Sequence, residues 1–206
     1  GSICSSRGIE MTDAVRVMAI GTGVVMNSTL TGILCTGMAL AEEKEKHTLR
    51  ALMTSSVSGL EFFFGSVAPV AVMTVIVNCI LVLAGGLMPT PAGWLLWIGV
   101  SALCAAAAVV TGMIFGICAK DQVTASTIMS LPMLVLVMIP VFGEFNETMA
   151  RISKCLFTGV LQETLNTLAG EAPAVRVSGL LVIAAEIAAA AVIFVLVYRR
   201  NGYDKD

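Results

Sequence analysis

The chain has 206 residues, of which 57% are hydrophobic and only 13% are charged, and its formal net charge at pH 7 is -2. Soluble domains carry about 25% charged residues, so this chain has too few charges to cover the surface of a soluble enzyme. The absence of a basic excess argues against a nucleic-acid-binding protein, and the high apolar content excludes intrinsic disorder. A mean hydropathy of +0.93 indicates an integral membrane protein.

Uncharged segments long enough to cross a bilayer occur five times along the chain, since about 20 apolar residues span the hydrocarbon core. Residues 62–119 carry no charge and are long enough for two spans, which Pro89 and Pro91 separate because proline opposes helix continuation. The predicted spans are 17–41, 62–88, 93–119, 123–143 and 177–198. The sequence therefore predicts an all-α polytopic membrane protein, with one transmembrane domain over residues 1–206.

Basic residues predict the orientation of these spans. Seven of the twelve Lys and Arg residues lie in the loops 42–50 and 119–122 and in the C-terminal segment 199–206. Cytoplasmic loops are enriched in Lys and Arg, so we expect these segments, including the C-terminus, to face the cytoplasm, and the N-terminal segment to lie outside the plasma membrane. An outer N-terminal segment without a signal peptide leads us to expect an earlier span, in a parent protein of six spans. Trp94 and Trp97 follow the proline turn, and we expect them in the interfacial aromatic belt.

Two segments are neither spans nor tight turns. In residues 42–58, Leu49, Leu52 and Met53 recur at helical spacing, which predicts a short amphipathic helix at the cytoplasmic surface. A solvated loop with a cluster of charges is the alternative. Residues 144–175 alternate charged residues with apolar residues at helical spacing, which predicts an outer re-entrant helical segment that dips into the outer leaflet or lies on it.

The segment after the first span resembles the signature of type 2 ABC exporter permeases, which reads approximately E-x-E-x-G-T-L-x-x-L-x-x-S-P-V-S-x-x-E-x-x-x-G-K. The residues that match this signature are Glu43, Glu45, Thr48, Leu49, Leu52, Ser55, Val57, Ser58, Glu61 and Gly65. His47, Ser56 and Ser66 stand where the signature has Gly, Pro and Lys. Residues 140–170 also resemble the outer re-entrant helices of this family. The resemblance covers the whole chain, with the family's first span and part of its first outer domain missing.

The resemblance implies the permease subunit of an ATP-driven exporter, embedded in the lipid bilayer. Such a subunit dimerises with a second copy or a homologous permease to form the translocation path, and it works with a cytoplasmic ABC ATPase. Residues 42–58 would be its coupling segment, and the implied coupling residues are Glu43, Glu45, Thr48, Leu49, Leu52 and Glu61. The chain contains no G-x-x-x-x-G-K-[ST] phosphate loop. We therefore expect no enzymatic activity and no cofactor on this chain, with ATP and Mg²⁺ bound by the partner ATPase.

Polar residues inside the spans are candidates for the substrate path. Asn27 and Thr31 lie in the first span, and Glu186 lies near the middle of the last one. An ionised carboxylate at that depth costs about 2.5–3.5 kcal/mol on the insertion scale, so a hydrogen-bonded or protonated Glu against a neighbouring helix is the alternative for Glu186. The first span also carries a stripe of small residues, Gly21, Ser28, Gly32, Cys35 and Ala39. Such a stripe favours tight helix packing, and it also leads to the hypothesis that it faces the dimer seam.

Neither a catalytic nor a metal site is predicted, because His47 is the only histidine and the six cysteines form no metal-binding motif. Cys4 and Cys155 both fall on the predicted outer side, where a disulfide and two free thiols are the alternatives.

An ion-coupled secondary transporter or channel, with Glu186 as its ion site, is the alternative function. Such a protein would be expected to contain internal repeats or several intramembrane charges. A lipid-modifying membrane enzyme would need clustered His, Asp or Ser at a membrane face, which the sequence lacks.

Overall fold

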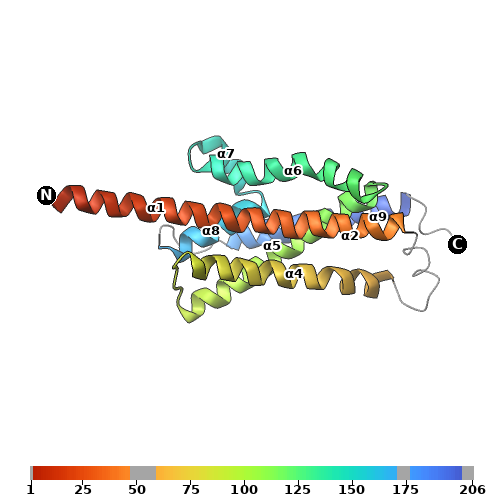
Figure 1. The fold of residues 1–206 in the computed structure, drawn as a ribbon, viewed down its shortest axis with the longest axis horizontal. Coiled ribbons are helices and arrows are strands. Elements are labelled where there is room, and N and C mark those ends of the chain that lie inside the picture. The colour runs from red at the N-terminus through yellow and green to blue at the C-terminus, as the bar shows by residue number, and fades with distance from the viewer. Residues whose placement is uncertain (1, 47–58, 171–176, 201–206) are drawn as a thin grey trace.

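The structure is a computed structural model that describes residues 2–46, 59–170 and 177–200 (Figure 1). Every regular element within these residues is a helix. In chain order they are α1 (Ser2–Asn27), the π-helix η1 (Ser28–Cys35), α2 (Thr36–Glu45), α4 (Gly59–Ala84), α5 (Pro91–Cys118), α6 (Gln122–Gly143), α7 (Glu147–Ser153), α8 (Phe157–Leu168) and α9 (Val177–Arg200).

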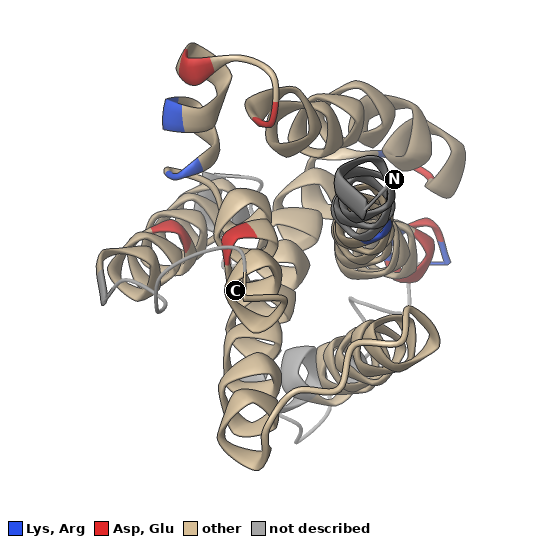
Figure 2. Ribbon diagram, turned by 90° about the vertical axis from the view of Figure 1, so that its left-hand side faces the viewer, with Lys and Arg blue, Asp and Glu red and all other residues tan. Residues whose placement is uncertain are grey.

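Five helical stretches are long and apolar enough to cross a membrane. They are Val15–Glu45, Val67–Ala84, Pro91–Cys118, Gln122–Gly143 and Ser178–Val197. Viewed from the end where the chain begins, the ribbon is mostly free of charged residues (Figure 2). The prediction of an all-α polytopic membrane protein is therefore confirmed.

The first span is longer than predicted. Helices α1, η1 and α2 follow one another without a break, and α1 projects beyond the other helices (Figure 1). Residues 42–45, which the sequence analysis assigned to the start of the coupling segment, continue this helix. Ala, Glu and Lys favour helix, and no proline or glycine lies between Gly37 and Lys46 to end it. The predicted amphipathic helix after Lys46 lies outside the described residues.

Helix α5 is the centre of the bundle, since it packs against η1 and against α2, α4, α6, α8 and α9. Its backbone comes very close to that of the first span. A Cβ atom at Gly116 would lie 2.6 Å from the carbonyl oxygen of Gly37, and one at Gly112 would lie 2.9 Å from Cα of Ile33. Real Cβ contacts under 3.0 Å are essentially never seen, so only glycine fits at these positions.

The stripe of small residues in the first span divides into two parts. Gly21, Ser28 and Gly32 are buried within the chain, where Gly21 contacts Gln162 of α8 and Gly32 contacts Ala108 of α5. Tight packing inside one chain therefore accounts for this part of the stripe, and these three residues cannot face a dimer seam. Cys35 and Ala39, by contrast, are exposed.

The turn at Pro89 and Pro91 separates α4 from α5 as predicted. Pro91 occupies the first position of α5, and the Thr90 hydroxyl caps that helix by accepting a hydrogen bond of 3.2 Å from the N–H of Gly93. The prediction that Trp97 belongs to an interfacial belt is wrong, because its side chain is completely buried. Helix α8 packs on α5, with Leu168 beside Gly93, and Trp97 belongs to the same hydrophobic core as the buried residues of α8.

The segment that is predicted to lie on the outer side forms two helices with a break at residues 154–156. Helix α7 packs on α6, whereas α8 packs on α1 and α5, and most of its first nine residues are buried. Gly170, with a φ of +81°, follows α8 in the left-handed conformation that commonly ends helices. Helix α8 therefore lies inside the bundle, whereas the prediction that residues 144–175 form an outer re-entrant segment stays a prediction.

The close contact between α5 and the first span predicts opposite effects for two glycines of α5. Gly112→Ala should lower the free energy of unfolding by about 1–3 kcal/mol, because the new methyl group overlaps the backbone of Ile33. Gly99→Ala meets nothing within 4 Å and should be neutral or slightly stabilising, because alanine favours helix. Thermal unfolding in detergent micelles measures both, and equal midpoints for the two variants would contradict the packing described above.

Candidate functional site

A polar network joins three helices in the middle of the bundle, and Asn78 of α4 is its centre. The Asn78 side chain is completely buried. Its Nδ2 donates to the hydroxyl oxygens of Ser28, at 3.0 Å, and Ser101, at 2.8 Å. Its Oδ1 accepts a hydrogen bond of 2.8 Å from Nδ2 of Asn27. One amide therefore ties α4 both to the first span and to α5.

Asn27 and Thr31, the predicted path residues of the first span, belong to this network. Besides its bond to Asn78, Asn27 donates to the carbonyl oxygen of Thr74 at 3.1 Å. Its own Oδ1 accepts a hydrogen bond of 3.0 Å from the Thr31 hydroxyl. The polar groups of both residues are thus used within the chain, although each side chain remains half-buried.

The network lies where the first span changes its helical geometry. Asn27 is the last residue of α1, and Ser28 is the first residue of the π-helix η1. π-helical turns are rare and are frequent at functional sites. Asn78 was missed by the sequence analysis, although one signal for it exists: it is the only Asn, Gln or charged residue between Phe62 and Ala119.

Glu186 of α9 has a defined partner, which lies outside this network. Its Oε2 accepts a hydrogen bond of 2.8 Å from the backbone N–H of Phe157, the first residue of α8. The N-cap residue of α8, Leu156, provides no side-chain cap. Glu186 therefore caps α8, and its carboxylate lies at the positive end of the α8 helix dipole. This is the hydrogen-bonded arrangement that was the alternative to an ion site.

The start of α8 is also held by α5. The Cys104 thiol donates to the carbonyl oxygen of Phe157 at 3.5 Å, and Cys104 lies near the middle of α5. The first peptide units of α8 are therefore fixed between the middle of α5 and the middle of α9, deep inside the bundle.

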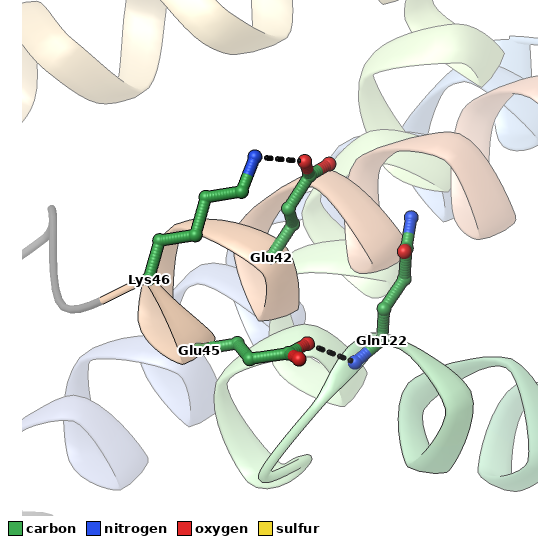
Figure 3. A network of polar contacts seen from close by, with 4 residues as sticks. All are labelled: Glu42, Glu45, Lys46 and Gln122. Atoms are coloured by element: carbon green, nitrogen blue, oxygen red, sulfur yellow. Dashed lines mark hydrogen bonds and ion pairs between the residues drawn. The ribbon is translucent and has the colours of Figure 1, made fainter.

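At the opposite end of the first span, charged residues contact neighbouring helix ends. Lys44 donates through Nζ to the carbonyl oxygens of Ile117, at 2.8 Å, and Ala119, at 2.7 Å. Glu45 Oε2 accepts a hydrogen bond of 3.3 Å from the backbone N–H of Gln122 (Figure 3). The sequence alone predicts for Lys44 only a cytoplasmic positive charge.

Two further polar contacts stabilise the same end. Lys46 pairs with Glu42 one turn earlier (Figure 3), and this hydrogen bond and ion pair raise the pKa of Lys46. Asp121 caps α6 by accepting a hydrogen bond of 2.7 Å from the N–H of Thr124, which holds the pKa of the Asp121 carboxyl below its usual range. Side chains therefore cap the C-terminal end of α5, through Lys44, and the N-terminal end of α6, through Asp121.

The structure describes only part of the predicted coupling set. Glu43 and Glu45 lie in the last turn of α2. Glu61 lies in the first turn of α4, and only its backbone is described. Thr48, Leu49 and Leu52 lie outside the described residues.

Among side chains that are described, no group of three or more His, Cys, Asp or Glu could hold a metal ion. Cys155 is an exposed free thiol, and the Cys4 side chain is not among the described side chains.

Comparison with known proteins gives one match. Residues 10–199 match the model of a family described as ABC-2 family transporter protein. No curated protein and no solved structure matches the chain.

Removing the centre of the polar network should destabilise the protein. Asn78→Leu leaves the buried hydroxyls and the Asn27 amide without their partner, at an expected cost of about 1–3 kcal/mol. Thr111→Val is the matched control, since the Thr111 hydroxyl donates only to Ala107 of its own helix. A thermal midpoint in detergent that falls no further for Asn78→Leu than for this control would contradict the network's structural role.

Substitution of Glu186 separates helix capping from ion binding. Glu186→Gln keeps an oxygen that can accept the Phe157 N–H, so it should retain most of the thermal stability. Glu186→Leu removes the cap and should cost about 0.5–2 kcal/mol. Equal destabilisation by both variants would show that the negative charge, rather than the acceptor, is what the site requires.

Proposed function

The chain belongs to the ABC-2 transporter family, and on this basis we propose that it is the membrane-spanning permease subunit of an ATP-driven exporter. The family match confirms the resemblance found in the sequence and makes the chain a multi-pass permease component of an ABC transport system. The proposal adds that the permease dimerises to form the translocation path. It also adds that residues 42–58 couple the permease to a separate cytoplasmic ATPase, which binds ATP and Mg²⁺.

The observation that carries the proposal is the continuity of the first span. The helix runs through η1 and α2 as far as Glu45, and its last turn contains Glu43 and Glu45, the first two residues that match the family signature. Helical residues rise about 1.5 Å each, so about 25 Å of helix separates Glu45 from the polar network at Ser28. A displacement at the cytoplasmic end would therefore reach the middle of the bundle along one uninterrupted element.

The outer surface of the chain supports a lipid environment and a second permease. Helices α4, α6 and α9 expose large apolar side chains, among them Val72, Leu131, Leu134, Leu181 and Leu196. Large apolar side chains exposed in such number are covered by lipid or by another protein. We place the protein in the plasma membrane with its C-terminus in the cytoplasm, on the basis of its basic loops.

The ion-coupled alternative gains no support from the described contacts. Its proposed ion site, Glu186, caps α8 through the Phe157 N–H, and an exporter driven by a partner's ATP hydrolysis needs no such site.

The coupling segment predicts a specific contact with an ATPase. A photo-crosslinking amino acid at position 49 or 52, introduced in cells, should form an adduct with a protein that contains a G-x-x-x-x-G-K-[ST] motif. Mass spectrometry of the isolated adduct identifies that motif.

Phe145 provides the control position, since it is 74% exposed and lies between α6 and α7, at the other end of α6. The same cross-linker at position 145 should capture no ATPase. Adducts with an ATPase from position 145 but none from positions 49 and 52 would refute both the coupling role and the orientation.

A further inference from the structure

Two consecutive residues at the end of the first span hold the turn between α5 and α6. Lys44 donates to the carbonyl oxygens of Ile117 and Ala119, at 2.8 and 2.7 Å. Glu45 accepts from the N–H of Gln122 at 3.3 Å (Figure 3). The contacts join residues more than 70 positions apart in the chain, so the turn is fixed by the first span as well as by its own helices.

Each charge matches the helix end that it contacts. The last carbonyl groups of a helix lack intrahelical partners and carry a partial negative charge, whereas the first N–H groups carry a partial positive charge. The Lys44 ammonium lies at the C-terminal end of α5, and the Glu45 carboxylate lies at the N-terminal end of α6. Hydrogen bonds to charged groups are about twice as strong as neutral ones, so both contacts favour the observed arrangement.

The surrounding packing makes this end of the bundle one unit. Ala119 and Ala41 are completely buried beside the contact, and a Cβ at Gly37 would overlap the Met129 side chain of α6. Helix α2 packs on α5 and α6, whereas it has only sparse contact with α4. A movement of the α2 end would therefore act on α5 and α6 before it acts on α4.

We propose that Lys44 is a positioning residue that transmits movement of the coupling segment to α5 and α6. This inference rests on the proposed function, since it assumes that an ATPase acts on residues 42–58. Lys44 lies between the two glutamates of the family signature, at a position that the signature leaves open. We infer its role from its two contacts with the carbonyl oxygens of Ile117 and Ala119. In this mechanism one movement of the coupling segment displaces three spans. The first span moves the C-terminal end of α5 and the N-terminal end of α6 with it.

Hydrogen–deuterium exchange of the whole permease–ATPase complex in lipid nanodiscs tests the proposal. The complex is measured without nucleotide and with ATP plus vanadate, and uptake is compared in peptides that cover residues 42–46 and 116–125. In the wild-type protein, exchange in both regions should change with nucleotide. In Lys44→Met, the region 116–125 should exchange about tenfold faster without nucleotide and should lose its response to nucleotide.

Lys46→Met is the matched control, because Lys46 lies two residues away and its ammonium group pairs with Glu42, one turn earlier in the chain. This variant should keep the wild-type response in both regions. Lys44→Arg should restore the response, because a guanidinium can donate to the same carbonyl oxygens. A nucleotide response at 116–125 that persists in Lys44→Met, or that Lys44→Arg fails to restore, would overturn the proposal.

Two additional measurements keep the result unambiguous. If Lys44→Met does not assemble, Glu45→Ala removes only the contact to Gln122, and an unchanged response at 122–125 would count against the proposal. Failure of the proposed function has a different signature: no ATPase would then bind the wild-type permease. A failure of the present inference leaves ATPase binding intact and changes only the exchange at the turn.

Discussion

The close backbone contact between the first span and α5 is the constraint on which the other contacts depend. Gly37 of the first span and Gly112 and Gly116 of α5 leave no space for a Cβ between the two helices. The short side chains of Ser28 and Ser101 can therefore reach one amide, that of Asn78. The same approach brings Lys44 within hydrogen-bond distance of the end of α5. A wider separation, as larger residues would impose, would leave the buried polar groups of Ser28, Ser101 and Asn78 without partners in a region where water cannot replace them.

Polar groups inside a membrane protein are expensive unless they are paired, and this chain pairs its most prominent ones across helices. Asn27 and Asn78 satisfy each other, and Glu186 satisfies the first N–H of α8. In the bilayer interior, a hydrogen bond between helices contributes about 0.6 kcal/mol on average to stability. The main effect of these hydrogen bonds is therefore to determine which helix faces pack together. The residues that looked most like a substrate path from the sequence thus have structural partners within one chain.

The number and order of the spans could be predicted because they depend on the length of uncharged segments and on Pro89 and Pro91, which are local properties. The contacts could not, because they depend on how each helix is rotated about its axis. Asn78 is an isolated polar residue in the sequence, and its partners lie 23 to 51 positions away. The start of α8 was missed because its cap is Glu186, 29 positions further on. Trp97 was placed wrongly because α8 covers α5, and local composition does not reveal that cover.

The π-helix between Ser28 and Cys35 has a consequence for the angular relation between the two ends of the first span. Each residue of an α-helix turns the chain by about 100°, and a π-helical turn accommodates more residues than an α-helical one. The wide turns therefore rotate the faces of α2 about the helix axis relative to those of α1. Asn27 can face α4 at mid-depth while Lys44 faces the end of α5, although both belong to one helix. The eight residues of the π-helix fix this rotation, so they determine which neighbouring helix each end of the first span contacts.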